Sequence, residues 1–263
     1  MIITRRKLLL SSSLSLGAFA APAIIGRAQP VSVFVQGSLG AAPIGTPTSF
    51  GAGQSGGIGN VSSYAISTSA AVKAGYLAIV AVTITTNNTQ TVLSVSDGTN
   101  SYAKAETTGL YGTFTETSLW YKLNAAAVGS GATITVDFTG ASGSGTNIAA
   151  ILTAQVSGIL TSGALDQVKA ASTTAADTVT ATTSTLGKAN EIAFGYSAAL
   201  NATVPTYSGA PNFTNLSQTT DGGLTRTALD YDTVAATTAV SFSPAYTAAS
   251  FRMGGVVATF EGN

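Results

Sequence analysis

The 263-residue chain contains no cysteine and no histidine. Zinc sites, cysteine nucleophiles and Ser-His-Asp triads need a thiolate or an imidazole, so the composition excludes all three. The absence of cysteine also excludes disulfides, so the core alone must hold the fold together. The chemistry that is left consists of carboxylates, of lysine or tyrosine as a base, and of metals bound by oxygen, such as calcium.

Charged residues are also scarce, at 8% of the chain. Binding to nucleic acid through phosphates needs grouped lysine or arginine, and no such group follows Arg27. Without residues 1–28 the chain keeps 7 of its 11 Lys and Arg against 11 Asp and Glu, a net charge of −4. The sequence therefore predicts no nucleic-acid partner.

The first 28 residues have the pattern of a twin-arginine export signal. Arg5 and Arg6 precede an uncharged run from Leu8 to Gly26, and small residues stand at positions −3 and −1 of a cut after Ala28. The pattern predicts a protein exported to the periplasm, the cell surface or the medium. An uncleaved anchor is the alternative, because the run is nearly long enough to span a bilayer. Its serines, glycines and proline favour cleavage.

After residue 29 the chain predicts short strands between clusters of Gly, Ser, Thr, Asn and Asp, with no amphipathic helix and no later membrane span. Ala132–Gly140 alternates between apolar and polar residues, as a half-exposed antiparallel strand does. Leu77–Ile84, Ile148–Val156 and Met253–Phe260 are apolar on both faces, as expected of central strands. The predicted fold class is all-β, a two-layer antiparallel β-sandwich of jelly-roll type.

Residues 29–263 are predicted to form a single domain, with a long Gly- and Pro-rich loop at 37–60 between the first two strands. No repeat of fixed period is evident. The first strand is expected to pair with the last, since an unpaired apolar edge invites aggregation. Nine further strands are expected at Val31–Gln36, Ser62–Thr68, Thr91–Asp97, Thr115–Leu123, Leu165–Ala170, Thr178–Thr183, Glu191–Ser197, Thr225–Thr233 and Thr237–Phe242.

Eight short motifs follow one another in a recognisable order: AVKAGYLAIVAV (71–82), VLSVSDGTNSY (92–102), SLWYKLN (118–124), ATITVDF (132–138), AQVSGI (154–159), ALDQ (164–167), ANEIAFG (189–195) and MGGVVATFEG (253–262). In this order the chain resembles β-sandwich modules of secreted bacterial surface proteins and of phage tail or fibre proteins. The resemblance implies a jelly-roll, lectin-like sandwich without a defined set of catalytic residues.

Two groups of residues are candidates for binding. Asp97 and Asn100 follow a predicted strand and could hold calcium, although Asp-Gly is first of all turn chemistry. Trp120 shares a strand face with polar residues, so it is either a platform for stacking on a sugar or a core residue. Asn201, Tyr207 and Asn212 lie in an irregular stretch that could form a ligand loop, where ordinary loop residues are the alternative.

Asp230 and Asp232 share one face of a predicted strand with Arg226, either as a solvated face or as a pair able to flank a sugar bond. The solvated face is favoured, because a glycosidase acid needs a raised pKa. The predicted function is therefore a non-enzymatic surface or binding protein that recognises glycans or mediates adhesion. The alternatives are a self-assembling component of a surface or phage-like fibre and a carboxylate-dependent glycan-cleaving enzyme.

Overall fold

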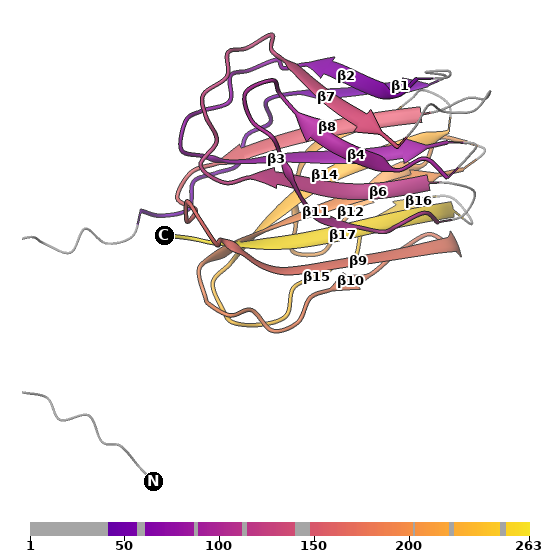
Figure 1. Ribbon diagram of the computed structural model, residues 1–263. Helices are drawn as coiled ribbons and strands as arrows, with labels where there is room; N and C mark the ends of the chain where they lie inside the picture. Colours follow the sequence, from indigo (N-terminus) through magenta and orange to yellow (C-terminus); the bar gives the residue numbers. More distant parts are fainter. Residues whose placement is uncertain are drawn as a thin grey trace, which may run out of the picture. The chain divides into compact units, whose positions relative to one another are not determined.

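The computed structural model describes residues 42–56, 61–86, 89–111, 115–139, 148–201, 203–220, 224–247 and 251–263. They belong to one compact unit, Leu39–Asn263. Their regular structure is all β, and the strands of each sheet pair antiparallel (Figure 1). This confirms the predicted all-β antiparallel sandwich. A helix long and apolar enough to cross a membrane is absent from the described residues.

The strands of the described residues follow one another along the chain without an intervening helix. They are β1 (Ala52–Gly56), β2 (Ser63–Ser67), β3 (Leu77–Thr85), β4 (Val92–Ser96), β5 (Ala103–Thr107), β6 (Thr115–Lys122), β7 (Thr133–Phe138), β8 (Ile148–Val156), β9 (Leu165–Ala176), β10 (Ala181–Thr182), β11 (Glu191–Leu200), β12 (Thr206–Gly209), β13 (Thr214–Thr220), β14 (Thr225–Val234), β15 (Ser241–Phe242), β16 (Ala245–Thr247) and β17 (Phe251–Glu261).

Two five-stranded sheets pack face to face in the middle of the sandwich. The first has the order β1-β8-β3-β6-β5, and the second has the order β13-β14-β11-β17-β9. Ile79 and Leu119 of the first sheet share one fully buried cluster with Phe194 and Phe260 of the second. The ring of Phe260 also lies 5.4 Å from that of Tyr121, across the two sheets. This cluster joins the two sheets.

A three-stranded sheet, β2-β7-β4, covers the outer face of the first central sheet. The apolar side chains of β7 that alternate along its sequence, such as Ile134 and Val136, pack there against Val80, Trp120 and Ile151. The first central sheet is therefore buried on both faces, which accounts for the uninterrupted apolar sequences of β3 and β8.

The outer face of the second central sheet is covered by two short pairs of strands, β10–β15 and β12–β16. Phe242 of β15 lies against Gly195 of β11, where an added Cβ would stand 2.4 Å from the phenyl ring. Only glycine permits this close approach. The two predicted layers are thus present, and each has a further layer on its outer face.

The two halves of the chain have the same strand order. When β15 and β16 are taken as two pieces of one strand, β9 to β17 correspond one by one to β1 to β8. The order β1-β8-β3-β6-β5 of the first central sheet then matches β9-β17-β11-β14-β13 of the second, and the covering strands match in the same way. β6 and β14 also share the pattern Thr-x-Thr-x-Leu-x-Tyr, at 115–121 and 225–231. A search for a fixed period misses this repeat, because β14 begins 110 residues after β6 while β17 begins 103 after β8.

The structure corrects two expectations about the ends of the domain. The predicted loop 37–60 contains β1, which pairs with β8 even though its sequence, AGQSG, has no apolar alternation. The last strand, β17, is paired along both edges, with β11 and with β9, so it has no free edge for the predicted first strand, Val31–Gln36. That predicted strand and the predicted signal peptide, 1–28, lie outside the described residues.

Candidate functional site

Trp120 lies in the core and offers no surface to a ligand. It is 4% exposed and packs between the first central sheet and its covering strands. Its Nε1 donates a hydrogen bond to Ser118 Oγ at 3.0 Å, and Lys104 Nζ lies 4.9 Å from the ring centroid. The polar face of β6 is therefore an interior face, which rules out a stacking platform and leaves the core alternative.

Asp97 and Asn100 form a closed turn. Asp97 Oδ1 accepts hydrogen bonds from the backbone N–H groups of Thr99 at 3.0 Å and Asn100 at 2.6 Å. Asp97 Oδ2 accepts from Asn100 Nδ2 at 2.9 Å and from the Tyr102 hydroxyl at 3.0 Å. The side-chain oxygen of Asn100 accepts from the backbone N–H of Ala126 at 2.8 Å. Since these oxygens already accept protein donors, the residues fit the turn and do not fit calcium.

The three candidates from the irregular stretch lie in different places. The backbone N–H of Asn201 donates to Leu224 O at 3.0 Å, which ties the end of β11 to the start of β14. Tyr207 belongs to β12 and packs inward, its ring 5.1 Å from that of Tyr246. Asn212 is exposed and lines a cavity. Of the predicted site residues, Asn212 is therefore the one that the structure places at an accessible site.

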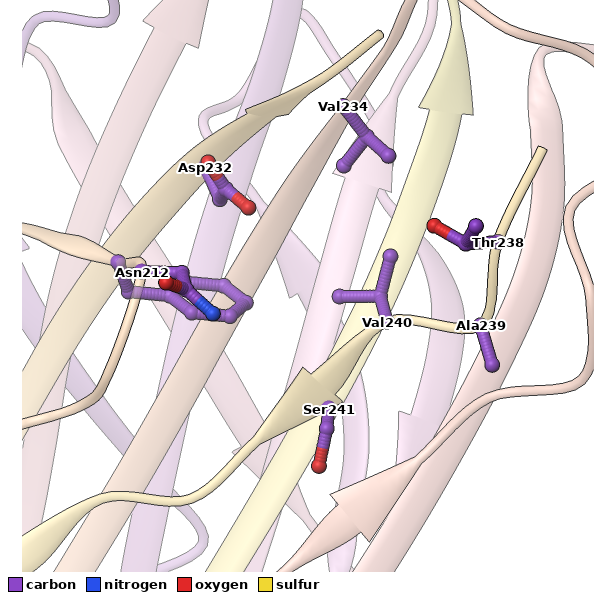
Figure 2. Close-up of a pocket in the computed structure, with 8 residues that line it drawn as sticks. Asn212, Asp232, Val234, Thr238, Ala239, Val240 and Ser241 are labelled. Carbon is purple, nitrogen blue, oxygen red and sulfur yellow. The ribbon is translucent and has the colours of Figure 1, made fainter. Parts of the chain in front are cut away.

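The cavity has a volume of about 220 Å³ and opens on the outer side of the second central sheet. Three segments enclose it: the turn between β12 and β13, the end of β14, and the segment that leads into β15. Figure 2 shows Asn212 and Asp232 on one side and the run from Thr238 to Ser241 on the other. The lining residues are Asn212, Phe213, Asp232, Val234, Thr238, Ala239, Val240 and Ser241.

Asn212 is held at the cavity by the turn in which it sits. Its φ of 67° is in the left-handed region, which asparagine tolerates better than most residues. The next residue, Phe213, donates its backbone N–H to Ala210 O at 3.2 Å and places its ring 5.0 Å from Phe242, edge to face. The contact of half-buried Phe213 with fully buried Phe242 thus anchors the loop that presents Asn212.

The cavity combines hydrogen-bonding groups with an apolar wall. It offers the carboxylate of Asp232, the amide of Asn212 and the hydroxyls of Thr238 and Ser241, beside the buried side chain of Val240. Asp232 is half-buried, and this burial raises its pKa. Such a lining suits a small ligand that has both hydroxyl groups and an apolar face.

Asp230, two residues before Asp232, is buried, which corrects the expectation of a solvated strand face. It is 1% exposed, and its Oδ2 accepts a hydrogen bond from the Tyr207 hydroxyl at 2.5 Å. Asn215 Nδ2 donates to Oδ1 at 2.8 Å. Burial raises the pKa of Asp230 to about 6. Arg226 does not act as its counter-charge, since its guanidinium donates to a backbone oxygen and a glutamine instead.

We expect Asp230 to make the protein more stable in mild acid. Its pKa is raised from 3.8 to about 6, so the native state holds the proton more tightly than the unfolded chain. This stabilisation is complete below pH 3.8 and is lost as the pH rises through 6. Asp230 should then contribute about 1.4 kcal/mol more at pH 5 than at pH 7.5. Thermal melts of the parent and of Asp230→Asn at the two pH values should show this difference in stability for the parent alone. An equal pH dependence in both proteins would contradict the prediction.

The sequence pointed to only part of this cavity. Asn212 was a candidate because it lies in an irregular stretch that could form a ligand loop, whereas Asp232 drew attention only as a neighbour of Asp230. The opposite wall, from Thr238 to Ser241, carries no motif, and it reaches Asn212 only because β15 covers the sheet that contains β14. Comparisons with family models, curated proteins and solved structures give no match.

Proposed function

We propose that this protein is a non-enzymatic glycan-binding protein of the exported class. The cavity lined by Asn212, Phe213 and Asp232 is the observation that supports the proposal. Pockets for drug-sized ligands have volumes of roughly 300–1,000 Å³. A cavity of about 220 Å³ is smaller and suits a single sugar unit. The carboxylate and the amide would bind the sugar hydroxyls, and Phe213 and Val240 would contact its apolar face.

The arrangement of acids favours binding over hydrolysis. A glycosidase needs two carboxylates that reach the scissile bond from both sides. Asp230 is fully enclosed and is hydrogen-bonded to Tyr207 and Asn215, so among the residues that the structure describes Asp232 is the one acid that lines the cavity. A lone carboxylate can orient a hydroxyl but cannot supply both the acid and the base.

The export signal and the fold type complete the proposal. The arginine pair Arg5–Arg6 supports export through the twin-arginine route, with the binding cavity then available outside the cytoplasm. We infer that each repeat is a variant of the jelly roll, which divides eight strands between two antiparallel sheets. The β-strand count and the shared strand order of the two halves support this inference.

A glycan array with the purified protein tests the proposal. We expect the parent protein to bind one class of glycan on the array. Asp232→Asn should lower the affinity for that glycan about tenfold or more. A hydrogen bond to a charged group contributes roughly 1.5–3 kcal/mol, and the substitution removes the charge without changing the volume. Asn212→Ala should weaken binding less, because the group that it removes is neutral.

Thr233→Ala is the matched control, because Thr233 lies beside Asp232 on β14 but is exposed and does not line the cavity. It should leave binding unchanged. The proposal is wrong if the parent protein retains no glycan, or if Asp232→Asn binds as tightly as Thr233→Ala.

A further inference from the structure

Three carboxylates converge at one end of the second central sheet, next to the cavity, since Glu191 pairs with Val234 of the cavity lining. Asp166 is near the start of β9, Glu191 begins β11 and Glu261 ends β17. Because β17 runs antiparallel to both neighbours, these three positions meet at the same sheet end (Figure 1). A carboxylate oxygen from each residue lies within 4.8 Å of the other two. We call these residues the acidic triad.

Glu191 is the unusual member of the triad. Its side chain is fully buried, and neither carboxylate oxygen makes a hydrogen bond of normal length, although Thr259 and the backbone N–H of Lys188 lie close enough to favour its charged form. It also lies directly opposite Glu261 across the β11–β17 pair, a position where like charges destabilise a sheet. A buried carboxylate with few donors destabilises the fold strongly unless a cation or a proton offsets its charge. Burial accordingly raises the pKa of Glu191 to about 7.

The other two acids have partners. Asp166 Oδ2 accepts a hydrogen bond from the backbone N–H of Gly187 at 2.7 Å. Glu261 forms an ion pair with Lys188, whose side chain is 62% exposed. Three carboxylates and one ammonium leave a formal charge of −2 when every acid is ionised. This charge matches one divalent cation.

We propose that the acidic triad of Asp166, Glu191 and Glu261 is a calcium site. Calcium takes six to eight oxygen ligands in flexible geometry and accepts several carboxylates, with water completing the shell. Magnesium demands near-octahedral geometry and is usually held by one or two carboxylates together with substrate phosphates, so three converging acids favour calcium. The ion would offset the buried charge of Glu191 and would tie together the ends of three adjacent strands.

The first repeat shows that the strand arrangement does not itself require these acids. β8 and β17 can be aligned on the glycine that ends Val156-Ser157-Gly158 and Phe260-Glu261-Gly262. This alignment places Ser157 where the second repeat has Glu261. The β3–β8 pair thus ends without an acid at this position. The acidic triad is therefore an addition of the second repeat to a common frame.

Calorimetric titration of the purified full chain with CaCl₂ at pH 7.5 tests the proposal, together with thermal melts in CaCl₂ and in EDTA. We expect the parent to bind one calcium ion and to melt at a higher temperature with calcium than with EDTA. Glu191→Gln should weaken calcium binding tenfold or more and should abolish the calcium-dependent shift in melting temperature. It should still melt cooperatively in EDTA, because the substitution removes a buried charge and keeps the volume.

Two further variants make the test specific. Lys188→Gln removes the ammonium that competes for Glu261, so it should strengthen calcium binding severalfold, a gain that general destabilisation would not produce. Glu106→Gln changes a half-buried acid of β5 outside the triad and should leave binding unchanged. The proposal is overturned if calcium neither binds to the parent nor shifts its melting temperature, or if Glu191→Gln binds calcium as the parent does. Because the glycan cavity shares no residue with the triad, either proposal can fail alone.

Discussion

Deleting residues 252–263 is expected to abolish soluble, cooperative folding. These residues form nearly all of β17, which pairs with β11 along Glu191–Leu200 on one edge and with β9 on the other. Within the described chain, β9 has no other neighbour in its sheet, and β11 would be left with a long apolar edge. The deletion also removes Val256, Ala258 and Phe260, all fully buried between the central sheets.

The size of the expected effect follows from these losses. Removing a large buried side chain costs roughly 2–5 kcal/mol, and the deletion removes several of them together with two strand pairings. The whole free energy of unfolding of a typical domain is only about 5–15 kcal/mol. Soluble yield and circular dichroism melts would measure the result. A deleted protein that melts cooperatively near the parent temperature would show that β17 is dispensable.

Removal of Asn263 alone is the matched control, because this residue is exposed and follows β17. It should fold and melt as the parent does, apart from the loss of one backbone hydrogen bond to Gly158. The contrast between the two truncations separates the need for β17 from a general sensitivity of the C-terminus.

The sequence predicted those strands that carry their own apolar pattern. β3, β8 and β17 are continuous apolar runs and β7 alternates strictly, so each was expected near its observed bounds. β1 and β13 were not expected, because AGQSG and TNLSQTT have neither pattern. Both are edge strands. Hydrogen bonds to a single neighbour hold each in place, β8 for β1 and β14 for β13. Such pairing leaves little trace in the strand's own sequence.

The candidate sites could be predicted less well, because they depend on contacts between distant segments. The acidic triad gathers residues 166, 191 and 261, and no local spacing connects them. Of the two alternatives for Asp97 and Asn100, calcium ligands or a turn, the structure shows the turn, which the sequence could indicate because Asp-Gly chemistry is local. Trp120 and Asp230 were both assigned to polar strand faces, and both are buried, because a further layer of strands covers each central sheet. A single strand does not reveal how many layers lie above it.

Trp120 and Asp230 occupy equivalent positions in the two repeats, the sixth residue of β6 and of β14. Trp120 lies beside Lys104 of the neighbouring strand β5, whose Nζ stands over the indole ring. Asp230 lies under Tyr207 of the covering strand β12, whose hydroxyl donates to the carboxylate. At this equivalent position the first repeat has the large side chain of Trp120, and the second has Asp230 with its hydrogen-bond partners. Substitution at this site should therefore act on stability.

Trp120→Ala is expected to destabilise the protein by about 3–5 kcal/mol, because deleting a buried indole leaves a cavity between the first central sheet and its covering strands. The substitution also removes the hydrogen bond to Ser118 and the contact with Lys104. Urea or thermal unfolding would measure the loss. Leu93→Ala is the matched control: Leu93 is 61% exposed, so its truncation should change stability by less than about 0.5 kcal/mol. If Trp120→Ala melts like Leu93→Ala and instead loses glycan binding, the indole is accessible and its burial in the core is wrong.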